Sequence, residues 1–255
     1  MRAIVLTSQR TGSVFLQQCL DSHPQVRCYG EILLGYGGLS DRLPPAFLKR
    51  HRRLRTLWQY VMSGAAVRPV RTMDRIFESV PEADVVAFRV MYNQMDRDRR
   101  VAPYLTRDES LKVVHLVRDD AVRQYVSLHL MHNQAKLGRY EAHTKSKLPP
   151  KPLPIDPQAA LRGMRLFEQK KQEYRDRFSA HPMLEISYES MIEDGQMTAD
   201  ACDRLCGFLE VEPQQLTASI VKMNPSELSQ MISNYDEFAE VIGASEFGER
   251  LAVSV

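Results

Sequence analysis

The chain has 255 residues, of which 44% are hydrophobic and 26% are charged. This apolar fraction is typical of a globular protein and too high for a disordered one, and no window reaches the roughly 18 apolar residues of a membrane span. Lys and Arg number 34 and Asp and Glu 32, a formal net charge of +2, which excludes a protein whose whole surface binds nucleic acid. We expect one domain over residues 1–255.

Four short runs of apolar and β-branched residues predict strands that are buried on both faces of a sheet. They are Ala3–Thr7, Ala83–Met91, Leu111–Val117 and Met183–Tyr188. Because helical patterns alternate with these strands and every connection is long enough for a crossover, the fold class is α/β. We expect a three-layer domain with a mostly parallel central sheet flanked by helices.

Helices are expected over Val14–Leu20, Pro45–Met62, Ala121–Ala135, Pro157–Phe178, Met197–Leu209 and Pro225–Ile242. Asp120, Asp156 and Asn224 precede three of them as N-cap residues. The segment Ser146–Pro157 holds five of the 14 prolines and must be an extended loop, either beside an acceptor pocket or as a passive connection. The basic cluster Lys49–Arg55 either faces an anionic partner or forms a solvated helix face.

Four cysteines occur in the chain, at Cys19, Cys28, Cys202 and Cys206. They are too few for a disulfide scaffold and form no C-x-x-C pair, so we interpret them as small buried side chains. The N-terminal apolar run is much shorter than a signal-peptide core. We therefore expect a cytoplasmic protein.

The loop Ser8–Ser13 follows the first strand and precedes a helix, an arrangement that is typical of an anion site. Gly12 lets the backbone approach a ligand closely, Arg10 adds a permanent cation, and Thr11 and Ser13 add hydroxyl donors. The alternative is an ordinary turn with a surface arginine. A triphosphate-binding P-loop is excluded, because the loop has a single glycine and lacks the lysine that precedes the Mg²⁺-binding hydroxyl residue.

A second polar cluster follows the strand Leu111–Val117, where Arg118 stands between the strand and a helix that carries Ser127. An arginine with a hydroxyl side chain can bind a second phosphate group. The alternative for Arg118 is a salt bridge with Asp119 or Asp120.

These two clusters resemble the donor-binding motifs of sulfotransferases that use 3′-phosphoadenosine 5′-phosphosulfate (PAPS). SQRTGSVFLQQCLDSHP is similar to the 5′-phosphosulfate loop, and HLVRDDAVRQYVSL is similar to the 3′-phosphate motif. ADVVAFRVMYNQ, ISYESM and NPSELSQMISNYDEF also fit, in the family's order. The likeness is greatest to bacterial carbohydrate-type sulfotransferases.

The resemblance implies a P-loop-like fold that binds PAPS as the donor co-substrate and requires no metal. It makes Arg10, Thr11, Gly12 and Ser13 ligands of the phosphosulfate, and it makes Arg118 and Ser127 ligands of the 3′-phosphate. Val14 departs from the pattern, because many members have a hydroxyl residue there. Many members also have lysine in place of Arg10, which can stabilise leaving-group charge but is no general acid.

Transfer to an alcohol also needs a base, and Glu31 lies among apolar residues that raise the pKa of a carboxyl group. The resemblance places a base carboxylate here too; the alternative is a pair with Arg27 or another arginine. Arg89 lies within an apolar strand, either as a second cation for the transferred group or in a structural ion pair. His115 is the competing base, or else a buried core histidine.

We therefore expect a PAPS-dependent sulfotransferase acting on a hydroxyl of a carbohydrate or other small metabolite, by in-line transfer. Its catalytic residues would be Glu31, Arg10 and Arg89. The alternatives are a P-loop-like kinase, or a non-catalytic protein that binds anions or nucleotides. We expect no nucleic-acid partner and no transmembrane segment, and the oligomeric state is open.

Overall fold

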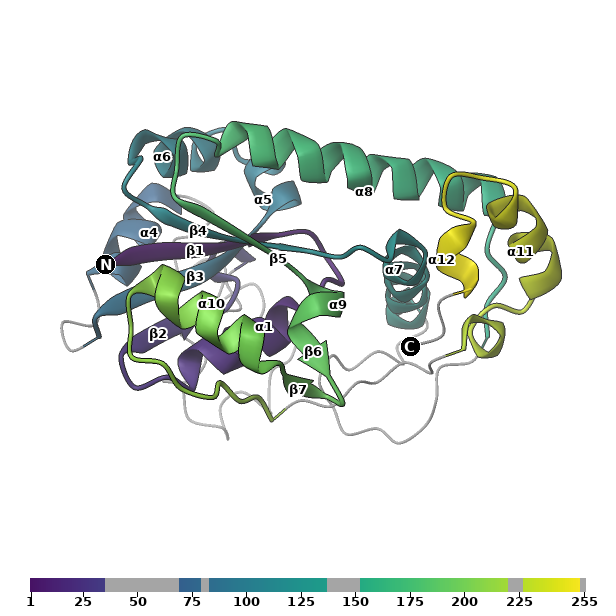
Figure 1. Cartoon of the computed structure of the whole chain (residues 1–255). Helices are drawn as coiled ribbons and strands as arrows, with labels where there is room; N and C mark the ends of the chain where they lie inside the picture. The colour runs from purple at the N-terminus through teal and green to yellow at the C-terminus, as the bar shows by residue number, and fades with distance from the viewer. Residues whose placement is uncertain (35–68, 79–82, 137–151, 220–226, 253–255) are drawn as a thin grey trace, which may run out of the picture. The chain divides into compact units, whose positions relative to one another are not determined.

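A computed structural model describes residues 1–34, 69–78, 83–136, 152–219 and 227–252 of the chain. The chain divides into two compact units. The sheet unit comprises Met1–Ser8, Gly12–Val117 and Tyr174–Ser219, and the helical unit comprises Gln9–Thr11, Arg118–Glu173 and Ile220–Val255 (Figure 1). The expected helix Pro45–Met62, the cluster Lys49–Arg55 and residues 146–151 of the loop Ser146–Pro157 lie outside the described residues. A single domain over residues 1–255 stays a prediction.

The sheet unit is built on a five-stranded sheet whose strand order is β2-β3-β1-β4-β5. The strands are β1 (Arg2–Thr7), β2 (Val26–Tyr29), β3 (Val85–Met91), β4 (Lys112–Val117) and β5 (Met183–Ser187). All four pairings are parallel, which confirms the predicted fold class. The sequence pattern did not predict β2, because its four residues include the exposed Arg27 and form no continuous apolar run.

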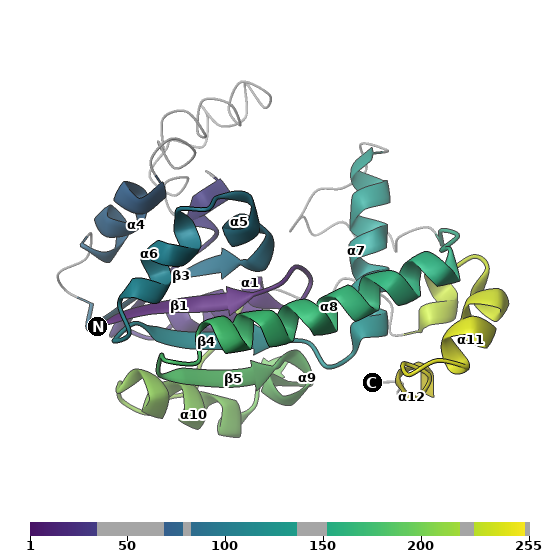
Figure 2. The ribbon, with the colours of Figure 1, turned by 90° about the horizontal axis from the view of Figure 1, so that it is seen from above.

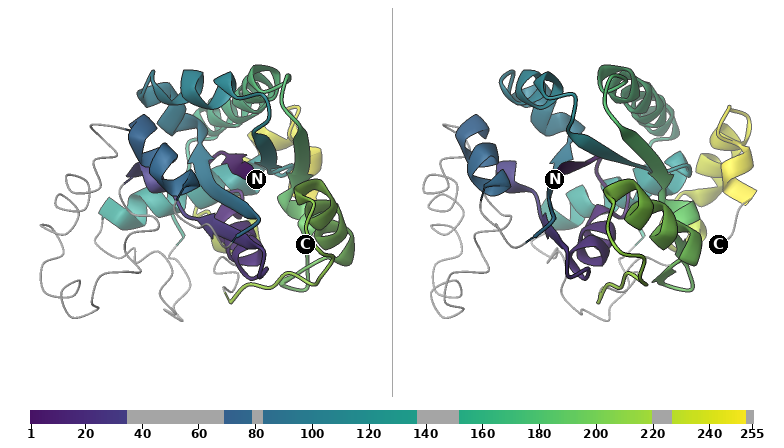
Figure 3. Two further views of the ribbon diagram at one scale, coloured as in Figure 1. Left: turned by 90° about the vertical axis from the view of Figure 1, so that its left-hand side faces the viewer. Right: turned by 60° about the vertical axis from the view of Figure 1, so that its left-hand side comes forward.

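Helices cover both faces of this sheet (Figures 2 and 3). On one face lie α4 (Pro69–Phe77), α5 (Tyr92–Arg97) and α6 (Val101–Arg107), and on the other lie α1 (Ser13–Asp21) and α10 (Ala199–Leu209). Ile4, Phe88 and Val113 pack in the core under the first group. Strand alternation then directs Arg89 to the opposite face. The three-layer prediction is confirmed, and all four cysteines are buried as expected.

Smaller elements complete the sheet unit. They are the 3-10 helix η1 (Ile32–Leu34), the short helix α9 (Tyr188–Met191) and the strands β6 (Ile192–Glu193) and β7 (Gln196–Met197), which pair with each other. The helix α10 begins two residues later than predicted, because Met197 pairs within β7 and the Thr198 hydroxyl caps the helix at the backbone N–H of Ala201.

The helical unit contains α7 (Ala121–Lys136), the larger part of α8 (Pro157–Arg177), the 3-10 helix η3 (Leu228–Gln230), α11 (Tyr235–Gly243) and α12 (Glu249–Ala252). Two predicted caps are confirmed. Asp120 Oδ1 accepts from the backbone N–H of Arg123 at 2.8 Å, and Asp156 Oδ1 accepts from that of Gln158 at 2.9 Å. Carboxylates suit these positions because first-turn N–H groups lack partners within the helix.

The helix predicted over Pro225–Ile242 is confirmed from Tyr235 onward, but it is wrong for residues 227–234. Ile232 forms a parallel β-bridge with Leu153, and Asn234 exchanges hydrogen bonds of 2.9 and 3.1 Å with the backbone of Ile155. In the bridge, the N–H of Leu153 donates to Met231 O and the N–H of Ser233 donates to Leu153 O, both at 3.1 Å. Backbone groups that a continuous helix would need are thus occupied, and α11 begins only at Tyr235. The expected cap at Asn224 lies outside the described residues.

A polar network joins β4, β5, α5 and α8 in the sheet unit; it is buried at His115 and Tyr92 and partly exposed at Glu185 and Arg175. His115, on β4, has no exposed surface; its Nδ1 donates to Glu185 Oε2 at 3.0 Å, and its Nε2 lies 2.5 Å from the Tyr92 hydroxyl. Arg175 binds both oxygens of Glu185, at 2.9 and 2.7 Å. The hydrogen bond from His115, with a further one from Arg175, lowers the pKa of Glu185 to about 2.

This pKa predicts how the stability of the protein depends on pH. The unfolded chain protonates Glu185 at an ordinary pKa of about 4.3, whereas the folded chain resists protonation down to about 2. The stabilisation is therefore complete above about pH 5 and falls as the pH drops toward 2. When urea unfolding is measured at a series of pH values, the free energy of unfolding of Glu185→Gln should fall less between about pH 5 and pH 2 than that of the parent protein. Glu193→Gln is the control. If the free energy of unfolding falls as much in Glu185→Gln as in this control, the assignment of the pH dependence to Glu185 is wrong.

Candidate active site

Arg89 is a charged residue within β3, a strand whose seven residues are all buried. Only 7% of Arg89 is exposed, and a buried guanidinium is costly unless polar groups surround it. Its Nη1 donates to Ser13 Oγ at 2.9 Å, and its Nη2 lies 3.6 Å from Glu31 Oε1. Its Nε is buried and has no acceptor among the described residues. Arg89 thus contacts two predicted site residues, and its Nε–H remains a buried donor without an acceptor among the described residues.

Glu31 follows β2 at the point where that strand leaves the sheet. The backbone N–H of Arg89 donates to Gly30 O at 3.3 Å, which places Glu31 beside β3. Oε2 of Glu31 accepts from Gln94 Nε2 at 3.1 Å, and 18% of the side chain is exposed. Burial raises the pKa of Glu31, while Arg89 and Gln94 oppose the rise. Glu31 is therefore a partly accessible carboxylate with an enhanced affinity for a proton, as its apolar neighbours predicted.

The first turn of α1 offers backbone N–H groups to a ligand. Its N-cap residue is Gly12, with φ +81°, so no side chain caps the helix. A Cβ at this position would overlap the ring of Tyr188, so only glycine fits. Ser13 is the first residue of the helix; its hydroxyl oxygen accepts from Arg89, which leaves the hydroxyl hydrogen to donate elsewhere. A helix N-terminus with these neighbours fits a sulfate or phosphate group.

The helical unit holds the other predicted donor-binding residues. Arg10 adopts a left-handed φ of 64°, and two contacts from the α7 region hold it: Arg118 Nη1 donates to Arg10 O at 3.0 Å, and Arg10 Nε donates to Ser127 Oγ at 2.8 Å. Gln124, only 2% exposed, donates to Gln9 O at 2.8 Å. Thr11 is fully buried.

The predicted site residues therefore fall into two groups, each joined by direct contacts. Ser13, Arg89 and Glu31 meet in the sheet unit, and Arg10, Arg118 and Ser127 meet in the helical unit. For Glu31 the expected arginine partner exists, but it is Arg89, since Arg27 pairs with Asp21 at 3.2 Å.

Sequence reasoning missed two glutamines, Gln94 and Gln124. The signal for Gln94 was its place three residues after the strand end at Met91, the N3 position from which glutamine reaches back to an N-cap residue. The signal for Gln124 was its place one turn after Asp120 on the same helix. Neither residue type stands out without the structure.

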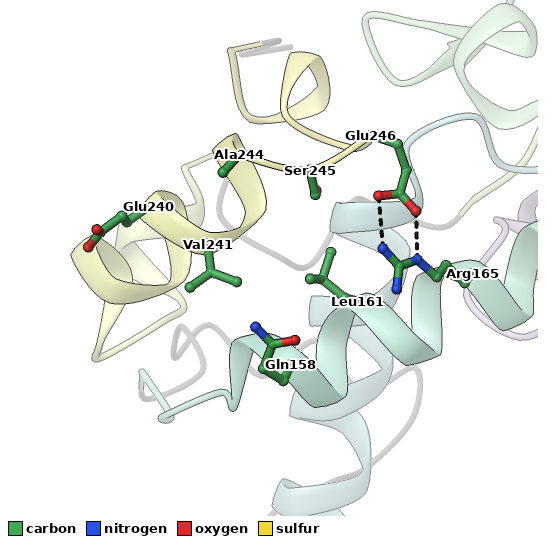
Figure 4. A pocket seen from close by; sticks show the side chains of 8 residues that line it. All are labelled: Gln158, Leu161, Arg165, Glu240, Val241, Ala244, Ser245 and Glu246. Atoms are coloured by element: carbon green, nitrogen blue, oxygen red, sulfur yellow. Dashed lines mark hydrogen bonds and ion pairs between the residues drawn. The ribbon is translucent and has the colours of Figure 1, made fainter.

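A cavity of about 510 Å³ in the helical unit holds none of the predicted site residues (Figure 4). It is lined by Gln158, Leu161, Arg165, Glu240, Val241, Ala244, Ser245 and Glu246. Its arginine and Glu246 pair with each other at 2.6 and 3.1 Å. The positive charge of Arg165 is therefore already balanced within the cavity by Glu246, and we do not place the chemistry there.

Comparison with known proteins identifies the family. The family model of the sulfotransferase domain matches residues 1–240, so the chain belongs to the sulfotransferase domain family and is a PAPS-dependent sulfotransferase. Among solved structures, it is similar to the "Sulfotransferase Domain from the Curacin Biosynthetic Pathway", with 14% identity and a TM-score of 0.47 over 98% of this chain and 95% of that chain. No match was found among curated proteins. No helix in the described ranges is long and apolar enough to cross a membrane.

The close contact at Gly12 predicts a substitution effect. Gly12→Ala should cost more stability than Gly195→Ala, because both replace a glycine of positive φ but only the first meets Tyr188. The conformational cost common to both is about 1–2 kcal/mol. Urea unfolding measures the stabilities, and calorimetry measures the binding of the desulfonated nucleotide. Equal losses in the two variants would contradict the close-packing account.

Proposed function

We propose that this sulfotransferase moves the sulfuryl group of PAPS to a hydroxyl group of a carbohydrate or other small acceptor, with Glu31 as the general base. One observation carries the proposal: the half-buried Glu31 carboxylate contacts Arg89, and Arg89 contacts Ser13 at the start of α1. A proton acceptor and an anion-binding helix terminus are thus linked through one cation.

We propose that Gly12 and Ser13, with the first-turn N–H groups of α1, bind the phosphosulfate group. The uncapped helix start, the missing Cβ and the available Ser13 hydroxyl hydrogen support this role. Arg89 would add positive charge, since its buried Nε has no acceptor in the described part of the chain. These groups would supply the charge stabilisation for which phosphoryl-transfer enzymes use a metal, so we propose that this sulfuryl transfer needs none.

We further propose that Arg118 and Ser127 bind the 3′-phosphate, and that Arg10 and Thr11 complete the set of donor ligands. Arg10 and Ser127 are in direct contact, and Arg118 holds the backbone of Arg10, so the three act as one cluster. A guanidinium with a hydroxyl group is a strong combination for a phosphate dianion. The resemblance of the HLVRDDAVRQYVSL segment to the family's 3′-phosphate motif supports the same assignment.

In the proposed step, the acceptor oxygen attacks sulfur in line with the leaving phosphate. The new O–S bond forms as the S–O bond to the 5′-phosphate breaks, and the bonding electrons leave with the phosphate oxygen. The acceptor proton passes to Glu31, whose raised pKa suits that task. Arg10 and Arg89 would stabilise the charge that develops on the leaving oxygen.

His115 is less suited to be the base than Glu31. It is fully buried, and both of its ring nitrogens are engaged, one by Glu185 and the other by Tyr92. A base must reach the acceptor proton directly or through one water. Glu31 retains exposed surface, so we assign the role to Glu31 and regard His115 as a structural residue.

The first test is turnover by a Glu31→Gln variant, with labelled PAPS and a panel of sugar and other hydroxyl acceptors. The substitution keeps the shape of the side chain but removes the proton acceptor. It should lower kcat by roughly 10²–10⁴-fold and leave binding of the desulfonated nucleotide intact. A Glu212→Gln control at an exposed site should behave like the parent. Full turnover in Glu31→Gln would refute the assigned base.

The second test concerns Ser127→Ala. Removal of a hydrogen bond to a charged group costs about 1.5–3 kcal/mol, so affinity for 3′-phosphoadenosine 5′-phosphate should fall by roughly 10–100-fold. Affinity for adenosine 5′-phosphate, which lacks the 3′-phosphate, should fall much less, through the lost contact of Ser127 with Arg10 alone. Calorimetric titration with both nucleotides separates these outcomes, with Ser190→Ala as the control. Equal losses for both nucleotides would contradict the assignment of Ser127 to the 3′-phosphate.

A further inference from the structure

We propose that Gln94 is a positioning residue for the reaction, which orients the Glu31 carboxylate and keeps it in the charged form that accepts a proton. The inference rests on the proposed role of Glu31 as the base. Gln94 lies on α5 and is only 3% exposed. Both polar atoms of its amide group are hydrogen-bonded, the oxygen to the backbone and the nitrogen to Glu31.

The orientation of the Gln94 amide follows from its partners. The helix α5 begins directly after β3, and Gln94 occupies its N3 position. Oε1 of Gln94 accepts from the backbone N–H of Met91 at 3.0 Å, which leaves Nε2 to donate to Glu31 Oε2 at 3.1 Å. A flipped amide would set a donor against a donor and an acceptor against an acceptor. Gln94 is therefore fixed as a donor toward the carboxylate.

Two different donors hold the two oxygens of Glu31. Arg89 Nη2 lies 3.6 Å from Oε1, and Gln94 Nε2 lies 3.1 Å from Oε2. Both come from the short segment 89–94, where β3 continues into α5. Contacts from β3 and α5 therefore fix the position of both carboxylate oxygens, which restricts the rotation of the carboxylate. Such restriction keeps a base within reach of its proton.

The same contact has an electrostatic effect. A hydrogen bond donated to a carboxylate favours its charged form, and Gln94 acts in this sense on Glu31, as does Arg89 from β3. Among the other groups facing Arg89, burial raises the pKa of the Cys28 thiol on β2 to about 12, so this thiol stays neutral, and Ser13 of α1 accepts from the guanidinium. Gln94 therefore opposes the rise in the pKa of Glu31 that burial causes.

Two substitutions separate this role from simple packing. Gln94→Glu keeps an acceptor for the Met91 N–H but sets a second carboxylate against Glu31. Gln94→Met keeps the length of the side chain and removes both hydrogen bonds. In each variant Glu31 should bind its proton more tightly, so the acid limb of the kcat/KM profile should move up by roughly one pH unit. Activity should return toward the parent level at high pH, and binding of the desulfonated nucleotide should not change.

The chain supplies a matched control in Gln25, which makes the same pair of contacts elsewhere. Its Oε1 accepts from the backbone N–H of Glu212 at 2.9 Å, and its Nε2 donates to Asp84 Oδ2 at 2.6 Å. Gln25→Glu therefore makes the same chemical change far along the chain from Gln94, and it should leave the pH profile unmoved. Thermal unfolding of every variant checks that it is folded.

The titration of the Glu31 carboxyl carbon, followed by ¹³C NMR in the donor-free protein, gives a readout independent of turnover. We expect its midpoint to rise in both Gln94 variants and to stay constant in Gln25→Glu. An unmoved midpoint and an unmoved acid limb in folded Gln94→Glu and Gln94→Met would overturn the inference. Failure of the underlying assignment would look different, because Glu31→Gln would then retain turnover whatever the Gln94 variants did.

Discussion

The sheet unit depends on how one buried charge, the Arg89 guanidinium, is satisfied. β3 is otherwise an apolar strand between β1 and β2, and a lone charge there would oppose folding. Ser13 and Glu31 surround it, so the start of α1, the middle of β3 and the segment after β2 are held together by polar contacts. Loss of either partner would leave a buried cation poorly compensated, which is far more costly than loss of a surface pair.

The contacts that satisfy Arg89 also affect the pKa of Glu31, the proposed base. Burial alone would raise the pKa of Glu31 further and favour its neutral form, and a fully solvated carboxylate would be a weak base. Arg89 and Gln94 keep the carboxylate between these limits, with a raised pKa but with donors that favour its charged form. Arg89 also turns the Ser13 hydroxyl into a donor directed away from the guanidinium. We therefore regard Arg89 as the link between proposed donor binding and proposed proton transfer.

Sequence patterns predicted much of this arrangement. Apolar β-branched runs located four of the five strands, and the capping residues Asp120 and Asp156 located two helix starts. The pattern failed at β2, whose four residues form no continuous apolar run, and just before α11, where long-range pairing of Ile232 and Asn234 replaces the helix. Such pairings depend on segments about 80 residues away, and no local rule reports them.

The candidate site was predictable at its charged residues and not at its neutral ones. Arg10, Glu31, Arg89 and Arg118 are conspicuous because a charge beside a buried strand demands an explanation. For Arg89 the sequence left two roles open, a cation for the ligand or an ion pair, and the structure places it in an ion pair with Glu31. Gln94 and Gln124 act through the partners that folding supplies, so their roles become visible only once those partners are known.

A crystal structure with bound 3′-phosphoadenosine 5′-phosphate is the most direct test of the proposed link between donor binding and proton transfer. We expect the 5′-phosphate to lie on the first-turn N–H groups of α1, with the Ser13 hydroxyl in hydrogen-bond contact and Glu31 facing the side from which an acceptor would approach. A nucleotide bound away from α1, or a 5′-phosphate out of reach of the Ser13 hydroxyl, would refute this proposal.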